Sequence, residues 1–521
     1  MAAALLAAAL ALAIAVTAPA LATASVMPAT ASRTAARGRP KAPPPTPAQE
    51  LARTAKAPTA SAPAPVLAPG PLVWGAPVGI DSGPIDGLAC PSISLCVAVD
   101  GDGAAFTSSD PPGGVRTWLR ADVDGATPLT GVSCPSVAIC VAVDADGNVV
   151  TTANASGPGT AWNVARVDTS IGEPSPYGGG PGLLRGVACP SVSFCIAVDS
   201  VGSVVFSGAP TGGTSTWVLA HVDDNSDYGC AGGGLSCQAP LMSVSCPTVT
   251  LCAAADFTGN VLETATPSVS SLWSSQSAGG AGPESLWTVS CPSVSFCAAV
   301  NGAGGDAITW DPATGSHLTT HRLPIDAFGI WCSASALCLA AGEGANGTAE
   351  LIGSTDPAAR NPTWNVTDFG DVNAVSCPTR SVCVAADNEG DVIVGVTVTS
   401  LDGTLRGEAL GGHIPRIGAL VRQRGYTLAF ASPLAGQMHI EWALSGAAAR
   451  AVGDTGAAPL VLATASARFT GAQSQSVRLS LTAAGRRVLH AATRITVTAA
   501  ATYETNTGTV AAQRRLTLSS R

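Results

Sequence analysis

The chain has 521 residues, of which 46% are apolar, 4% aromatic and 12% charged, and its formal net charge is −9. This length predicts two or three domains, and the apolar share excludes an acidic, intrinsically disordered chain. The negative charge argues against a protein that binds nucleic acid. The abundance of small residues, Val and Pro predicts an all-β protein with many short strands and turns.

Residues 1–24 have the pattern of a secretory signal peptide. An apolar stretch runs from Ala2 to about Val16, and an Ala-x-Ala site follows at 20–22 or at 22–24. The alternative is an uncleaved membrane anchor, for which the stretch is barely long enough. We expect cleavage, no stable membrane span after it, and a secreted protein that is extracellular or associated with the cell wall.

Residues 25–71 are rich in Ala, Pro and Thr, with scattered positive charges. Such a composition cannot bury a hydrophobic core, so it predicts a disordered linker.

Seven copies of a short motif, two cysteines separated by five residues, follow the linker. Two of the copies are identical, CPSVSFC at 189–195 and at 291–297. The intervals between the first cysteines of successive copies are 44, 55, 57, 45, 41 and 45 residues. A period near 44 with strand-like content predicts a propeller or a solenoid.

Each unit contains four strand-like segments. In the second unit these are LTGVSC (129–134), CVAVD (140–144), NVVTT (148–152) and TAWNVARV (160–167). Four antiparallel strands per period form one propeller blade. Continuous apolar runs such as VAV are typical of sheets that pack on neighbours through both faces.

A tryptophan marks the fourth segment of most units. It occurs at Trp118, Trp162, Trp217, Trp273 and Trp364, and THRLPI (320–325) replaces it once. These are six segments for seven cysteine pairs. Trp74 precedes Cys90 by 16 residues, the same spacing as from Trp118 to Cys134. We therefore expect the N-terminal strand around Trp74 to complete the last blade, which closes a seven-bladed propeller over 72–398 and hides its edges.

The cysteine pairs predict disulfides that staple the hairpin between the first two strands of each blade, in an oxidising compartment. The alternative, zinc binding, lacks a nearby His or a second close pair. Two further cysteines lie outside the repeat and are expected to pair with each other. The expected bonds are Cys90–Cys96, Cys134–Cys140, Cys189–Cys195, Cys230–Cys237, Cys246–Cys252, Cys291–Cys297, Cys332–Cys338 and Cys377–Cys383.

The residues from 402 to 521 form a second predicted domain. IPRIGALVRQRG (414–425) predicts a short helix that ends at Gly425. Six strand-like runs follow, which predicts a small β-sandwich of immunoglobulin-like type, although no Cys-Trp-Cys pattern is present.

The repeat units resemble the SCPS-x-S-x-C repeats of secreted actinobacterial proteins. They are also distantly similar to the sialidase and Asp-box (BNR-like) propellers, through SSDPPGGVRTW (108–118) and STDPAARNPTW (354–364). Both segments keep the Ser, Asp and Trp of the box, with a longer spacing from Asp to Trp. The tail resembles C-terminal modules of secreted actinobacterial proteins. The resemblance implies a propeller fold and carries no activity with it.

The two long repeat intervals have their extra residues between the fourth-strand tryptophan and the next cysteine. These connections are adjacent around the ring, so they are expected on one face, where propellers bind ligands. The candidate ligand-binding residues are Asp168, Glu173, Tyr177, Asp223, Asp224, Asp227 and Tyr228. The alternative is a pair of solvated insertions.

Two acidic groups are weaker candidates for cation sites. Asp223, Asp224, Asn225 and Asp227 have oxygen ligands suited to Ca²⁺, but their spacing matches no EF-hand. An Asp or Asn closes the second strand of six units, at Asp100, Asp144, Asp199, Asp256, Asn301 and Asp387. Turn chemistry explains the second group better, because Asp near Gly is typical of a tight turn.

No catalytic constellation is apparent, and we expect no cofactor. The arginines are scattered rather than clustered for a carboxylate, and no His is oriented by an acid as in a serine triad. The sequence favours a secreted, non-enzymatic binding or cell-surface interaction protein whose extracellular ligand is a glycan or a protein. The alternatives are a carbohydrate-active, glycoside-cleaving enzyme that works from the long loops, and a structural envelope component.

Overall fold

The computed structural model describes residues 72–520, except for 156–160, 171–181, 224–238, 279–284, 303–304, 315–317, 335–336, 369, 455 and 457. The chain divides into a unit of residues 1–61 and a unit of residues 62–521, and every described residue belongs to the second. Within the described part, no helix is both long enough and apolar enough to cross a membrane.

The first part of the described chain consists of antiparallel sheets of consecutive strands. Each of six sheets has four strands. Their strands are β3 (Ile85–Ser92), β4 (Leu95–Asp100), β5 (Ala104–Ser108), β6 (Trp118–Asp122); β7 (Leu129–Ser133), β8 (Cys140–Asp144), β9 (Asn148–Thr152), β10 (Trp162–Arg166); β11 (Leu184–Ser191), β12 (Phe194–Asp199), β13 (Ser203–Ser207), β14 (Trp217–His221); β15 (Leu241–Thr248), β16 (Leu251–Asp256), β17 (Asn260–Thr264), β18 (Ser274–Ser277); β19 (Leu286–Ser293), β20 (Phe296–Asn301), β21 (Asp306–Trp310), β22 (Thr319–Arg322); and β23 (Ile325–Ala334), β24 (Leu337–Gly344), β25 (Ala349–Ser354), β26 (Asn365–Asp368). Short 3-10 turns precede three of the fourth strands, namely η1 (Pro111–Gly113) and η2 (Val115–Thr117), η4 (Thr214–Thr216) and η5 (Ser270–Leu272).

The remaining sheet of this part joins the two ends of the repeat region. Its strands β27 (Val372–Thr379), β28 (Val382–Asp387) and β29 (Asp391–Thr397) come from the end, and β1 (Leu72–Trp74) and β2 (Val78–Gly79) from the beginning. Leu72 pairs with Thr397 and Trp74 with Gly395. The N-terminal strand therefore supplies the outer strand, as the cysteine-to-tryptophan spacing predicted.

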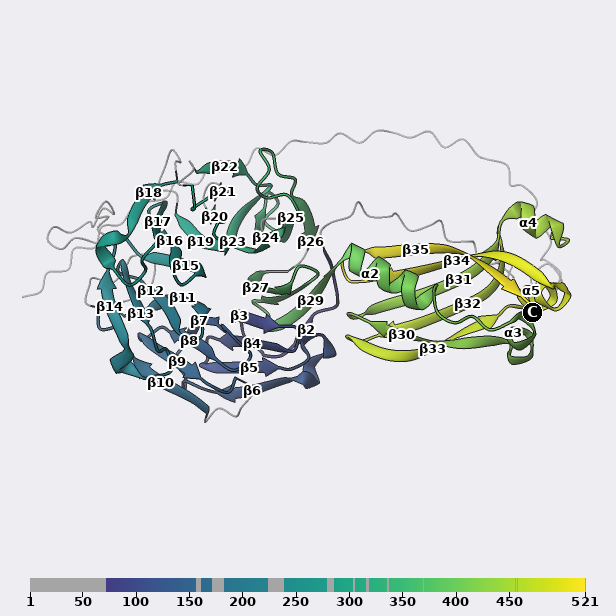
Figure 1. The fold of residues 1–521 in the computed structure, drawn as a ribbon, viewed down its shortest axis with the longest axis horizontal. Helices are drawn as coiled ribbons and strands as arrows, with labels where there is room; N and C mark the ends of the chain where they lie inside the picture. Colours follow the sequence, from purple (N-terminus) through teal and green to yellow (C-terminus); the bar gives the residue numbers. More distant parts are fainter. Residues whose placement is uncertain are drawn as a thin grey trace, which may run out of the picture. The chain divides into compact units, whose positions relative to one another are not determined.

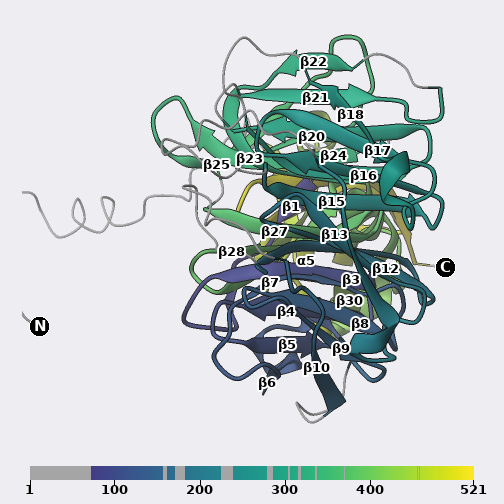
Figure 2. The ribbon, with the colours of Figure 1, turned by 90° about the vertical axis from the view of Figure 1, so that its left-hand side faces the viewer.

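The first strands of these sheets contact one another in a closed cycle. β3 contacts β7, each later first strand contacts the next one along the chain, and β27 contacts β3 again. Figures 1 and 2 show the sheets with these strands innermost and with strands such as β6, β10 and β22 at the periphery. Buried apolar clusters form between adjacent sheets, for example Val141 and Val143 with Ala197 and Val205. Repeated four-stranded blades of this kind match a β-propeller.

Seven disulfides are present among the described residues, one in each hairpin between a first and a second strand. They are Cys90–Cys96, Cys134–Cys140, Cys189–Cys195, Cys246–Cys252, Cys291–Cys297, Cys332–Cys338 and Cys377–Cys383. Each pair belongs to an apolar cluster between neighbouring sheets, as Cys90 and Cys96 do with Val384 and Ala386. The expected Cys230–Cys237 bond lies outside the described residues.

Some of the fourth strands differ from the prediction in where they begin or end. Trp118, Trp162 and Trp217 begin their strands, whereas Trp273 and Trp364 lie one residue before theirs. In THRLPI (320–325) the fourth strand ends at Arg322, and Ile325 already begins β23. The strand ends there because Leu323 donates its N–H to Gly305 in a turn and Pro324 has no N–H to donate.

The C-terminal module has six strands where the sequence predicted strand-like runs. These are β30 (Gly425–Ser432), β31 (Gly436–Leu444), β32 (Leu460–Phe469), β33 (Gln473–Leu481), β34 (Arg494–Glu504) and β35 (Thr509–Ser519). They pair in the order β30-β33-β32-β31-β34-β35. β32 and β33 share only two residue pairs, so the sheet is nearly divided between them.

Five helical segments accompany these strands, of which the sequence predicted one. They are α2 (Val398–Thr404), the π-helical η6 (Leu405–Ala409), α3 (Ile417–Gln423), α4 (Gly446–Ala451) and α5 (Ala483–Ala491). The predicted helix 414–425 is α3, which ends at Gln423 and is capped by Arg424 in the left-handed conformation. Gly425 follows at φ 135°, where a Cβ would lie 1.9 Å from the Leu479 carbonyl oxygen, so this position requires glycine.

Candidate functional site

One face of the propeller carries the turns between the second and third strands of each blade, and we call it the turn face. The glycine of each turn accepts hydrogen bonds from residues that follow the fourth strand. Asp124 and Asp168, for example, donate their N–H groups to Gly103 and Gly147. Residues just before a first strand accept hydrogen bonds from N–H groups of the same turns. The Leu183 carbonyl, for example, accepts from the Ser200 N–H. The long connections therefore begin and end at the turn face.

The aspartates that close the second strands hold these turns together. At Asp100, Asp144, Asp199, Asp256 and Asp387, Oδ1 accepts from the backbone N–H two residues on and again four residues on. The third residue after each is a glycine with φ between 80° and 86°. These hydrogen bonds confirm the turn interpretation of the aspartates.

Two of the predicted ligand-binding residues are described, and both are buried. Asp168 has 0% of its surface exposed and Asp223 has 1%. Oδ1 of Asp168 accepts from the Ser170 N–H. Burial first, and then the charge of Asp168, raises the pKa of Asp199 to about 6. The side chains of Asp168 and Asp223 are therefore shielded from solvent. Glu173, Tyr177, Asp224, Asn225, Asp227 and Tyr228 lie outside the described residues.

A different set of residues marks the inner strands near the turn face. Each first strand has a one-residue register shift, a β-bulge, at its start. All seven bulge residues are exposed or half-buried, whereas the residue before each of them is buried. Bulges commonly redirect side chains beside binding sites. We call these residues the bulge ring: Asp86, Thr130, Arg185, Met242, Trp287, Phe328 and Asn373.

The bulge ring occupies the variable position of an otherwise uniform repeat. Each member lies four residues before the first cysteine of its unit. The residue before it is apolar, the residue after it is small, and the seven bulge residues themselves are all of different types. An alignment of the units on their cysteines shows this contrast, whereas the lengths of the connections between blades do not.

Aromatic side chains gather on one arc of the bulge ring. Trp287 contacts Phe328 edge to face, with ring centroids 6.1 Å apart. It contacts Phe257, the residue after the turn aspartate of the preceding blade, at 6.0 Å in the same geometry. Phe328 remains 45% exposed. These three residues, the aromatic cluster, span three successive blades and offer an apolar surface to a ligand.

The opposite arc is polar. Thr130 donates its hydroxyl to the Leu184 carbonyl, and Asn373 donates its amide to Asn388. Desolvation, and then the negative charge of Asp100, raises the pKa of Asp86 to about 6. Desolvation lowers the pKa of Arg185, which interacts with Asp199. The ring is thus apolar on one side and polar on the other.

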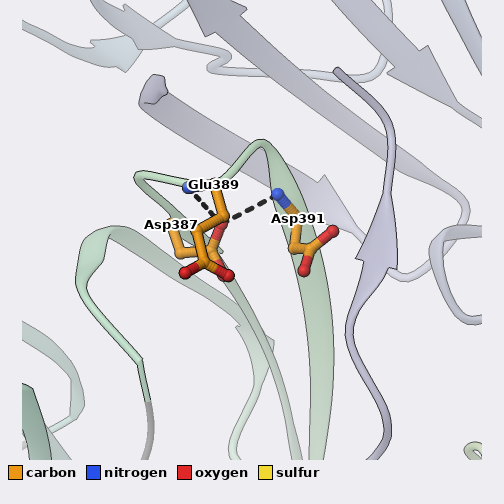
Figure 3. A group of neighbouring side chains, drawn as sticks. All are labelled: Asp387, Glu389 and Asp391. Carbon is orange, nitrogen blue, oxygen red and sulfur yellow. Dashed lines mark hydrogen bonds between the residues drawn. The ribbon is translucent and has the colours of Figure 1, made fainter. Parts of the chain in front are cut away.

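A group of three carboxylates lies at the last turn. Carboxylate oxygens of Asp387, Glu389 and Asp391 lie within 4.8 Å of one another (Figure 3). Asp387 accepts from the backbone N–H groups of the other two. Desolvation and the two neighbouring charges raise the pKa of Asp391. The turn structure accounts for this arrangement in full.

A buried carboxyl pair at the turn face makes a pH-dependent contribution to stability. Asp144 accepts three hydrogen bonds, from the backbone N–H groups of Asp146 and Asn148 and from the side-chain amide of Asn148. Burial, then hydrogen bonding and charge from Asp144, raises the pKa of Asp124 to about 7. The folded protein therefore keeps a proton that the unfolded chain releases near pH 4.

We expect this contribution to be complete below about pH 4 and lost as the pH rises through 7. Asp124→Asn should flatten that part of the stability profile, because the amide donates to Asp144 without titrating. Urea unfolding between pH 4 and pH 8 measures the effect. The exposed Asp102→Asn is the control, and an unchanged slope in the Asp124 variant would show that Asp124 does not hold the proton.

No family model and no curated protein matches the chain. Among solved structures it is similar to "YCF48 bound to D1 peptide", at 13% identity and TM-score 0.46, over 65% of this chain and 99% of that chain. It is similar to a chain of the mitotic checkpoint complex at 11% identity and TM-score 0.45, over 63% of this chain and 93% of that chain. It is similar to the Pan2 WD40 domain of Neurospora crassa at 12% identity and TM-score 0.43, over 60% of this chain and 89% of that domain's chain. At these identities no conclusion about a ligand follows.

Proposed function

We propose that this chain is a secreted, non-enzymatic binding protein whose propeller binds an extracellular partner at the bulge ring. The observation that carries this proposal is the variation of seven side chains at one structural position of a uniform repeat. A scaffold needs the same small and apolar residues in every blade. A ligand, which lacks the symmetry of the ring, needs a different side chain from each blade.

The chemistry of the bulge ring favours a segment of a protein partner with an apolar or aromatic side chain beside a basic one. The aromatic cluster offers the apolar contact, and Asp86 lies on the polar arc. Residues 72–398 carry 7 basic and 29 acidic side chains, a net charge of −22. Such a field attracts positively charged partners and speeds their association.

The architecture we propose is a seven-bladed propeller followed by an immunoglobulin-like module. The cycle of seven contacting first strands supports the blade number. In the module, β30 pairs with β33, and β32, β31, β34 and β35 pair in that order. An immunoglobulin-like sandwich without its first strand has this pairing, and Trp442, buried on β31, takes the place of its core tryptophan.

Peptides selected from a displayed random library on the full chain provide a ligand to measure. Trp287→Ala should weaken binding of the selected peptides at least tenfold, because truncated aromatic anchors cost about 2 kcal/mol or more. Leu119→Ala, which removes a 65% exposed side chain from the outer strand β6, should change it less than twofold. Equal effects of the two substitutions would reject the bulge ring as the site.

A hydrolysis screen on a glycan array separates this proposal from a carbohydrate-active enzyme. Turnover that disappears in Glu173→Gln or Asp223→Asn would reject the non-enzymatic function. Absence of any ligand, together with fractionation of the protein with the cell wall, would favour a structural envelope component.

Gly302→Ala tests the aromatic cluster without removing an aromatic residue. A Cβ at Gly302 would lie 2.3 Å from Nε1 of Trp287, so the indole has to move. We expect a shift in tryptophan fluorescence and at least fivefold weaker peptide binding. Gly208→Ala is the matched control, since its Cβ would meet nothing within 4 Å. An unchanged affinity in the Gly302 variant would show that the position of Trp287 does not matter.

A further inference from the structure

The C-terminal module has an open cavity of about 760 Å³ at one end of its sheet. Ala451 at the end of α4 and the following loop, Val452 to Asp454, form one wall, and α5 forms the other. Leu460, Val488 and Ile495 also line it and offer apolar surface. A second hollow of about 550 Å³ shares two of its residues and adds hydroxyl groups; it is lined by Thr493, Arg494, Thr517, Ser519 and Ser520.

Two guanidinium groups belong to this cavity. Arg487 on α5 and Arg494 at the start of β34 are both exposed. Within the described part of the chain neither forms an ion pair, whereas Arg406 of the same module binds Asp402 at 2.7 Å. One carboxylate also lines the cavity, but Asp454 accepts a hydrogen bond from the Gly456 N–H. The cavity therefore carries one net positive charge.

The charge of the whole module has the same sign. Residues 399–521 contain 13 Arg and 5 acidic side chains, a net charge of +8, against −22 for the propeller. No Lys is present among them. Arginine forms two parallel hydrogen bonds to one carboxylate or phosphate, and its planar group is weakly hydrated. This composition suits a surface that binds oxyanions.

We propose that this cavity is a second binding site, for an extended anionic ligand. The group that it binds is an oxyanion of that ligand, either a phosphate or a carboxylate. Arg487 and Arg494 bind the oxyanion, and the hydroxyl groups of Thr493 and Ser520 donate to its neighbouring oxygens. The apolar residues accept the carbon skeleton between the charges. The site is independent of the bulge ring, so the protein joins an anionic chain to a second, positively charged partner.

Binding of two probes to the full chain tests the proposal. Inorganic polyphosphate and poly-glutamate, each fluorescently labelled, are titrated at constant ionic strength, and the probe that binds identifies the oxyanion. Arg487→Gln with Arg494→Gln should weaken binding at least tenfold. Arg422→Gln with Arg468→Gln is the control, because it removes the same charge from exposed positions outside the cavity. It should weaken binding less than threefold.

Asp454→Asn gives a change in the opposite direction. Removing this carboxylate from the cavity should tighten binding of the same probe two- to threefold, which loss of structure would not do. The proposal is overturned if neither probe binds the unaltered chain. It is also overturned if both double variants lose affinity equally, because the whole charge of the module would then explain binding.

Discussion

A chain that begins at residue 76 is expected to lose most of its stability, because it lacks the strand that completes the last sheet. Leu72, Val73 and Trp74 are 5%, 7% and 1% exposed. Burial of each contributes about 1.5–3 kcal/mol, so their loss costs roughly 5–9 kcal/mol, comparable with the whole stability of a typical domain. The truncation also exposes the edge of β29, which favours aggregation.

The matched control is a chain that begins at residue 71, which keeps β1 and loses only the residues before it. Urea unfolding and size-exclusion chromatography compare the two. We expect the control to behave as the full chain does and the shorter chain to aggregate or to unfold at low urea. Equal midpoints for the two truncations would show that β1 does not close the ring.

Reduction of the disulfides is expected to have the second large effect. Each bond joins cysteines six residues apart and closes a loop of seven residues. The loop-entropy relation gives about 2.4 kcal/mol per bond as an upper estimate. The blades have few aromatic residues to replace this stabilisation, so full reduction should unfold the propeller.

Single bonds allow a graded test. Replacing both Cys189 and Cys195 by Ser should lower the free energy of unfolding by about 2 kcal/mol, measured in urea without reductant. The double change avoids an unpaired thiol. Reduction of the unaltered protein should then produce a much larger loss. A propeller that keeps its unfolding midpoint after complete reduction would show that the bonds do not stabilise it.

The repeat could be predicted from sequence because its signals are local and recur. Spacing between cysteines located the hairpins, and the spacing from Trp74 to Cys90 located the closing strand. Turn chemistry identified Asp144 and its equivalents as structural. Each of these features depends on a few neighbouring residues, so it is visible without knowledge of the packing.

The candidate site was harder to predict because its parts are distant in the chain. Phe257, Trp287 and Phe328 meet only because three blades bring them together. The bulge that exposes Trp287 depends on a register shift between two strands, which composition does not reveal. The long connections stand out by their length and acidic residues, but Asp168 and Asp223, the two candidate residues that the structure describes, are buried. Similarly, α5 was missed because only Gly485 and Leu489 of its residues are buried, too few to give a recognisable apolar periodicity.

The central claim is that the bulge ring, one residue from each blade, binds the partner. Amide hydrogen exchange of the full chain, with and without a selected peptide, tests it most directly. The account predicts protection around Trp287 and Phe328, at the starts of β19 and β23. Protection confined to the exposed hairpin tips at Ile93, Val192 and Val294, with no change at the bulges, would contradict it.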